Sequence, residues 1–191
     1  MQLTILLVLA AAAAVMFVIE RMGVPTTLDL HFKGDVKRES RWFAQYGQSM
    51  CTPVAALLVG TMDPAAKQKP FLVIGAVVAA SITCMLMKRT LGRVRPGREH
   101  AGKFLGPSWR HANYRESFPS SHSACAIACS VYIACLYPPI AWIMWGLGLT
   151  TATLRYLLDA HWPSDVLGGI AIGYASAHLW LQIAQPPPFA R

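Results

Sequence analysis

The chain alternates between long apolar blocks without Asp, Glu, Lys or Arg and shorter polar stretches. Six such blocks can be traced, at residues 3–19, 42–62, 70–87, 120–137, 138–154 and 166–184. A helix that crosses the hydrocarbon core of a bilayer needs about 20 mostly apolar residues. The pattern therefore predicts six transmembrane helices. Five is the alternative, because the 42–62 block contains Gln45, Gln48 and Pro53.

A buried helix of a soluble protein is the competing interpretation of any single block. The composition argues against that interpretation for the six blocks together. Hydrophobic residues make up 54% of the chain and charged residues only 14%, whereas about a quarter of the residues in a soluble protein are charged. Six blocks in 191 residues leave too little polar sequence to solvate a globule. We expect an all-α, polytopic membrane protein with one domain over residues 1–191. The Pro-rich tail 185–191 is predicted to be disordered.

The first block, residues 3–19, shares only its apolar character with a signal peptide. A cleaved signal needs a positively charged start, and Met1-Gln2 provides none, while apolar residues continue to Ile19. The block is therefore predicted to remain as the first span.

The five cysteines all lie inside apolar blocks, without the spacing of metal ligands. An odd number of thiols within spans argues against a disulfide framework. They are interpreted as small apolar packing residues.

The net charge of +8 is concentrated on one side of the predicted topology. Apart from the three motif cations described below, eleven Lys and Arg residues fall in the first and third loops and three on the opposite side. The chain has no nucleic-acid-binding module, so attraction to anionic lipid headgroups is the simpler explanation, and the bilayer is the expected partner. Residues 35–46 mix charges with aromatic side chains, which fits either a short helix in the headgroup layer or a solvated loop. The sequence carries no signal of oligomeric state.

Three polar motifs lie between or at the ends of the apolar blocks. They read K-x6-R-P, P-S-S-H and R-x5-H-x3-D, and they supply Lys88, Arg95, Ser120, Ser121, His122, Arg155, His161 and Asp165. With six spans, all three motifs fall on the same face of the membrane. Cations that hold an oxyanion, together with a nucleophile, an acid and an orienting carboxylate, suit phosphoryl transfer.

Local spacing suggests how these residues work. Lys88 and Arg95 are two helical turns apart, but Gly92 and Pro96 predict that the helix frays before Arg95. Pro119 and Ser120 fit the start of a helix, whose free backbone N–H groups form a natural phosphate seat. The i, i+4 spacing of His161 and Asp165 allows the carboxylate to fix the imidazole tautomer. For a single Lys or Arg at the end of a span, the ordinary alternative to phosphate binding is snorkelling, in which the side chain extends its charge to the membrane interface.

A metal site is the main chemical alternative, with His122, His161 and Asp165 as ligands. It is disfavoured because the three motif cations repel a divalent ion and attract an anion. We therefore expect neither a metal nor another cofactor.

With these motifs, the chain resembles the type 2 phosphatidic acid phosphatase family, whose signature is K-x6-R-P, P-S-G-H and S-R-x5-H-x3-D. The resemblance implies six transmembrane helices and hydrolysis through a phosphohistidine. It implies His161 as nucleophile, Asp165 as its orienter and His122 as the acid that protonates the leaving oxygen. The residues implied to hold the phosphate are Lys88, Arg95, Ser120, the backbone of Ser121, and Arg155.

Two positions depart from that signature. Ser121 replaces glycine and narrows the phosphate seat unless its side chain turns away, and Leu154 replaces a serine and removes one hydroxyl. Both affect the expected affinity and substrate range more than the reaction.

The expected activity is hydrolysis of a membrane lipid phosphate or diphosphate, namely phosphatidic acid, phosphatidylglycerol phosphate, a polyprenyl diphosphate or a lipid A-type phosphate. The alternatives are a lipid-phosphate binder or transporter without turnover and a vanadate-dependent haloperoxidase. The positive-inside rule places the basic face in the cytoplasm. Phosphate-binding loops are basic for functional reasons, however, and the resemblance implies work on the outer leaflet. We expect a bacterial inner-membrane protein with its site facing the periplasm or exterior.

Overall fold

The computed structural model describes residues 3–28, 30, 32–48, 51–63 and 67–184. The predicted disordered tail 185–191 lies outside these residues. The described residues form no β-strand and fold into seven α-helices: α1 (Leu3–Arg21), α2 (Gly34–Phe43), α3 (Cys51–Met62), α4 (Lys69–Leu91), α5 (Ser121–Leu136), α6 (Ala141–Leu157) and α7 (Pro163–Ala184). Three short 3₁₀ turns occur at Ala44–Gly47, Asn113–Arg115 and Pro138–Ile140.

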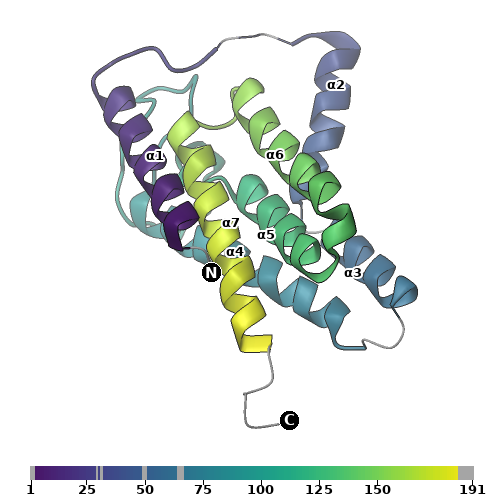
Figure 1. The fold of residues 1–191 in the computed structure, drawn as a ribbon. Coiled ribbons are helices and arrows are strands. Elements are labelled where there is room, and N and C mark those ends of the chain that lie inside the picture. The colour runs from purple at the N-terminus through teal and green to yellow at the C-terminus, as the bar shows by residue number, and fades with distance from the viewer. Residues whose placement is uncertain (1–2, 29, 31, 49–50, 64–66, 185–191) are drawn as a thin grey trace.

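Helix α5 forms the centre of the bundle (Figure 1). It packs against α4, α6 and α7, and residues 123–134 are all buried, while α1 lies along α7. Small residues allow the helices to approach closely. A Cβ at Gly173 would collide with the Ala124 carbonyl of α5, and one at Gly169 would collide with the Ser120 carbonyl. Close contact through small residues is typical of helices that associate in a membrane.

The outer surface of the bundle is apolar, as expected for contact with lipid. Large hydrophobic side chains such as Leu7, Leu57 and Phe71 are mostly exposed. Among the described residues, α1, α4 and α7 are long and apolar enough to cross a membrane, whereas α3, α5 and α6 are shorter. The prediction of an all-α polytopic membrane bundle is confirmed.

The predicted span at 42–62 is wrong as a single helix. Trp42 and Phe43 end α2, the Ala44–Gly47 turn follows, and α3 begins only at Cys51. The 12 residues of α3 rise roughly 18 Å, short of the ~30 Å hydrocarbon core. The separate helix α2 confirms helical structure for most of the 35–46 segment.

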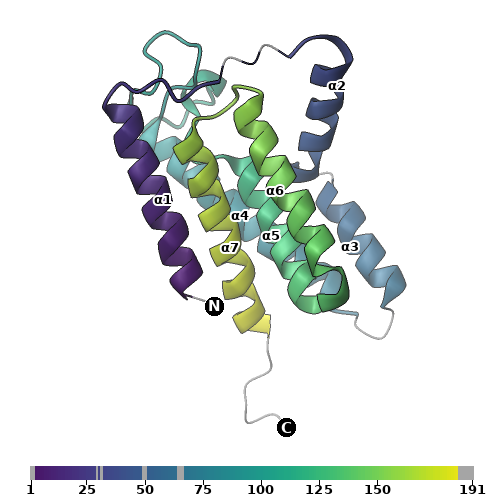
Figure 2. The same cartoon turned by 45° about the horizontal axis from the view of Figure 1, so that its top comes forward.

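The helix ends that carry the motifs lie together at one end of the bundle (Figure 2). Helices α4 and α6 end there, α5 and α7 begin there, and α2 lies at the same end. Helix α1 begins and α7 ends at the opposite end. The motif-bearing end is called the active face below.

Candidate active site

Helix α4 delivers Lys88 to the active face and then stops. Gly92 adopts φ +62°, a left-handed conformation that suits glycine, and its N–H donates to the Lys88 carbonyl at 3.1 Å. Arg95 therefore lies in the connection beyond the helix, as the predicted fraying required. Half-buried Lys88 remains in the last turn of α4.

Backbone carbonyls hold the Arg95 guanidinium in place. Its Nε donates to the Asn113 carbonyl at 2.8 Å, its Nη1 to Ala160 at 3.0 Å and its Nη2 to Glu116 at 3.4 Å. An arginine has five N–H donors, so two remain for a ligand. Burial lowers the pKa of Arg95, yet a guanidinium stays charged at any physiological pH.

Helix α5 begins at the predicted P-S-S-H motif. Fully buried Ser120 is its N-cap, and the hydroxyl accepts from the Ser123 hydroxyl at 2.9 Å and from the Ser123 N–H at 3.4 Å. The Ser120 oxygen is thus an acceptor within the cap, which leaves its O–H group as a donor. The next two residues, Ser121 and His122, line a pocket of about 530 Å³. First-turn N–H groups have no partner within a helix and can hold an anion.

The structure fixes the tautomer of His161. Its Nδ1 lies 2.8 Å from the Ser117 carbonyl oxygen, which can only accept, so Nδ1 carries the hydrogen and Nε2 keeps a free lone pair. Asp165 Oδ2 is 3.6 Å from the same nitrogen, too far for a normal hydrogen bond. Burial lowers the pKa of His161 to about 3, although Asp165 opposes the shift. The imidazole is therefore neutral at pH 7.

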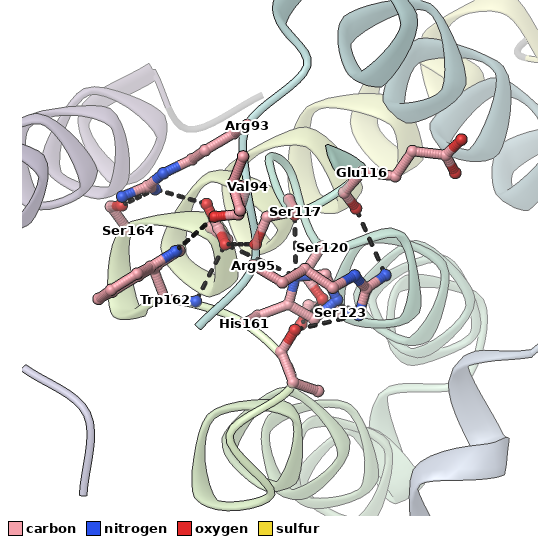
Figure 3. Close-up of polar contacts among 12 residues, drawn as sticks. Arg93, Val94, Arg95, Glu116, Ser117, Ser120, Ser123, His161, Trp162 and Ser164 are labelled. Carbon is pink, nitrogen blue, oxygen red and sulfur yellow. Dashed lines mark hydrogen bonds and ion pairs between the residues drawn. The ribbon is translucent and has the colours of Figure 1, made fainter. Parts of the chain in front are cut away.

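Asp165 is bound from several sides, and three of its partners, Arg93, Ser117 and Trp162, are labelled in Figure 3. Its Oδ2 accepts from the Ser117 hydroxyl at 2.5 Å and from the Trp162 N–H at 2.9 Å, and its Oδ1 accepts from Arg93 at 2.6 Å. Ser117 thus touches both the carboxylate and, through its carbonyl, His161. The structure links the predicted orienter to the histidine mainly through this shared serine.

Arg93 extends the network to the first helix. Its Nη2 donates to Glu20 of α1 at 2.6 Å, and Nη1 also donates to Ser164 at 2.7 Å. Glu20 accepts in turn from the Ser164 N–H at 2.9 Å. The side chains of Arg93, Glu20 and Asp165 are 1%, 2% and 0% exposed. One buried cation therefore lies between two buried carboxylates and pairs with both.

Aromatic rings complete the surroundings of the Arg93 guanidinium. Its carbon lies 5.4–5.6 Å from the ring centres of Phe17, Phe104 and Trp162. This distance is suited to cation–π attraction. Helix α1 thus supplies both a carboxylate and a ring to the scaffold of the site.

The sequence reasoning missed Glu20, Arg93 and Ser117. Glu20 did carry a signal, since a carboxylate directly after an apolar block is costly unless it is paired. Arg93 lies inside the K-x6-R-P motif but at one of its unspecified positions. The Ser117 contact to His161 is made by a backbone carbonyl and has no signal in the sequence.

The remaining predicted cation, Arg155, lies in the last turn of α6. Its Nε is buried and has no hydrogen-bond partner among the residues that the structure describes. Arg155, Lys88, Arg95 and His161 all lie within electrostatic range of His122. The structure therefore brings three cations and His161 within electrostatic range of His122, with Asp165 next to His161 and Ser120 capping α5.

Comparisons with known proteins agree with this arrangement. The family model of the PAP2 superfamily matches residues 69–187. A lipid A 1-phosphatase of Rhizobium johnstonii is 37% identical over 122 residues, which are 60% of this chain and 46% of that protein. A lipid A 1-phosphatase of Rhizobium etli is 40% identical over 104 residues, covering 51% of this chain and 42% of that protein. The matched stretches thus span less than half of either relative.

A solved structure shares the fold. It is the first transmembrane PAP2 type phosphatidylglycerolphosphate phosphatase from Bacillus subtilis, with a TM-score of 0.61 and 16% sequence identity. The match covers 99% of this chain and 96% of that one.

Proposed function

The chain belongs to the PAP2 superfamily, and from this premise we propose that it is a membrane phosphatase that hydrolyses a lipid phosphate or diphosphate through a phosphohistidine on His161. The observation that carries the proposal is the state of His161. Its Nδ1–H is held by the Ser117 carbonyl, and its neutral Nε2 is free beside three cations. A buried neutral imidazole with a fixed tautomer is a competent nucleophile.

In the first step, the lone pair of His161 Nε2 attacks phosphorus while the bond from phosphorus to the lipid oxygen breaks. A phosphate dianion beside His122 favours the imidazolium form of that ring, which then donates its proton to the departing oxygen. The dephosphorylated lipid leaves, and the phosphoryl group stays on His161. Asp165 and Ser117 keep the ring oriented throughout this step.

In the second step, water attacks the phosphohistidine from the side that the lipid has left. His122, now neutral, takes a proton from that water, and the P–N bond breaks to release inorganic phosphate. His161 and His122 return to their starting protonation states. One residue thus serves as acid and then as base, as microscopic reversibility favours.

The cations supply the electrostatic stabilisation that a metal provides in other phosphatases. Lys88, Arg95 and Arg155 surround the space in which negative charge develops on the phosphoryl oxygens. The Asp165 carboxylate is already bound by Arg93, Ser117 and Trp162, which leaves it poorly placed as a metal ligand. We therefore propose a reaction without metal.

The substrate classes stay those predicted from the sequence, and the names of the two rhizobial relatives favour a lipid A-type glycolipid phosphate among them. The direct test is phosphate release from a panel of purified lipid phosphates and diphosphates, with and without a chelator. Release from at least one lipid, unchanged by EDTA, supports the proposal. Release from none contradicts it.

We further propose that the protein lies in a bacterial inner membrane with its active face toward the periplasm or exterior. The excess of basic residues on this face is explained in part by phosphate binding rather than by topology. Because α7 ends opposite the active face, a reporter fused after Arg191 should be cytoplasmic. An extracytoplasmic reporter would reverse the assignment.

A further inference from the structure

Helix α2 and the turn after it carry a row of hydrogen-bond donors. Lys37 and Arg41 lie one turn apart on the same side of α2, and Gln45 and Gln48 follow in and directly after the Ala44–Gly47 turn. We call these four residues the α2 stripe. All four line one pocket of about 590 Å³ at the active face, together with Gly34, Arg38, Trp42 and Cys51.

The two cations of the α2 stripe are available to an anion. The neighbouring Arg38 is paired with Asp35 at 2.9 Å and with Glu39 at 3.3 Å. Neither Lys37 nor Arg41 forms an ion pair within the part of the chain that the structure describes. The pocket therefore combines two uncompensated positive charges with two amides.

The α2 stripe reaches a second pocket, whose lining includes His122. Gln48 lines both the 590 Å³ pocket and this 530 Å³ pocket, which Ser121 and His122 line together with residues of α3 and α4. Two observations show that this segment packs closely on α5. Gly47 lies so near the His122 carbonyl that a Cβ there would collide with it, and the Tyr46 and Ser130 hydroxyls are 3.0 Å apart. The Ala44–Gly47 turn, at the end of the stripe, is thus packed against α5 at His122.

We propose that the α2 stripe is a second anion-binding subsite, which holds a negatively charged part of the lipid headgroup beyond the phosphate that is removed. The stripe extends roughly 12 Å from Lys37 to Gln45 at the helical rise per residue. Phosphatidic acid has no second acidic group to place there, whereas a glycolipid with a second phosphate has one. The subsite thus narrows the proposed substrate class to lipids with at least two anionic groups, and this narrowing rests on the proposed function.

The test compares two substrates in neutral detergent micelles, where the charge of the bilayer plays no part. The substrates are phosphatidic acid and a bis-phosphorylated diglucosamine lipid. The variant Lys37→Gln/Arg41→Gln removes two charges from the stripe. The matched control Arg98→Gln/Arg110→Gln removes two charges from exposed positions elsewhere on the active face. We expect the stripe variant to raise KM about tenfold for the bis-phosphorylated lipid and less than about twofold for phosphatidic acid, with the control near wild type on both.

An equal loss on both substrates, or an equal loss in the control, would show that the stripe acts through general electrostatics and would overturn the subsite. No loss on either would overturn it as well. Binding of the bis-phosphorylated lipid to a His161→Ala background separates this inference from the proposed function. Weaker binding in the stripe variant supports the subsite even if no lipid is hydrolysed, and unchanged binding refutes it.

Discussion

Replacing Arg93 by methionine removes the cation that lies between two buried carboxylates. Arg93 donates to Glu20 and to Asp165, both at 2.6 Å, and all three side chains are at most 2% exposed. Methionine fills a similar volume, so the change mainly deletes charge and hydrogen bonds. The two carboxylates then remain in the interior without their shared partner.

The expected loss of folding free energy is large for a single substitution. Removing one partner of a buried ion pair typically costs about 3–5 kcal/mol, against a total stability of about 5–15 kcal/mol. For a chain of this length, each kcal/mol shifts Tm by about 2–4 °C, so a decrease of roughly 6–20 °C is expected. Glu20→Gln should cost less, because Arg93 keeps its bond to Asp165 and the amide can still accept a hydrogen bond.

The assay is thermal unfolding of the purified protein in detergent micelles. The exposed Arg98→Met is the matched control and should change stability by no more than about 0.5 kcal/mol. The expected order of destabilisation is Arg93→Met, then Glu20→Gln, then Arg98→Met. If Arg93→Met melts within about 2 °C of wild type, roughly 1 kcal/mol, the buried network does not stabilise the fold as described.

Three further predictions concern the chemistry. His122→Ala should lose about 10²- to 10⁴-fold in rate on a lipid monophosphate. The loss should be far smaller on an activated aryl phosphate, because its leaving group needs no proton. Equal losses on both substrates would show that His122 is not the acid. Vanadate should inhibit tightly because it imitates the five-coordinate transition state, and EDTA should not inhibit; EDTA inactivation reversed by a divalent ion would revive a metal site. His161 has a pKa of about 3 when folded and near 6.5 when unfolded, so it stabilises the fold above pH 6.5, and this contribution is lost as the pH falls toward 3. His161→Gln should therefore show a weaker fall in Tm between pH 7 and pH 5 than wild type, and an identical fall would contradict the burial argument.

Much of the helical architecture could be predicted from hydropathy. Five of the six apolar blocks match helices, with ends displaced by a few residues, because an uncharged run of that length has few other ways to satisfy its backbone. The 42–62 block was mispredicted because average hydropathy does not register a turn. There, residues 44–47 bend over α5, and Gly47 packs directly on the backbone of His122.

The motif residues could be found from spacing, but their partners could not. Arg93 and Glu20 are 73 residues apart in the chain, and they meet where the end of α1 and the connection after α4 both contact Ser164 at the start of α7. The start of α5 at Ser120 was predicted, and its hydroxyl oxygen caps the helix, while phosphate binding by the same residue stays a prediction. The tautomer of His161 depends on a carbonyl of Ser117, a group that every residue possesses.

The most direct test of the account is to trap the covalent intermediate. A ³²P-labelled aryl phosphate is mixed with the His122→Ala variant, which should form the phosphohistidine with this activated leaving group but hydrolyse it slowly. The reaction is quenched in alkali, where phosphohistidine survives, and the protein is digested and mapped by mass spectrometry. We expect labelled phosphate on His161 and none in a His122→Ala/His161→Ala variant. Label on another residue, or turnover by His161→Ala within about tenfold of wild type, a barrier change of only ~1.4 kcal/mol, would contradict it.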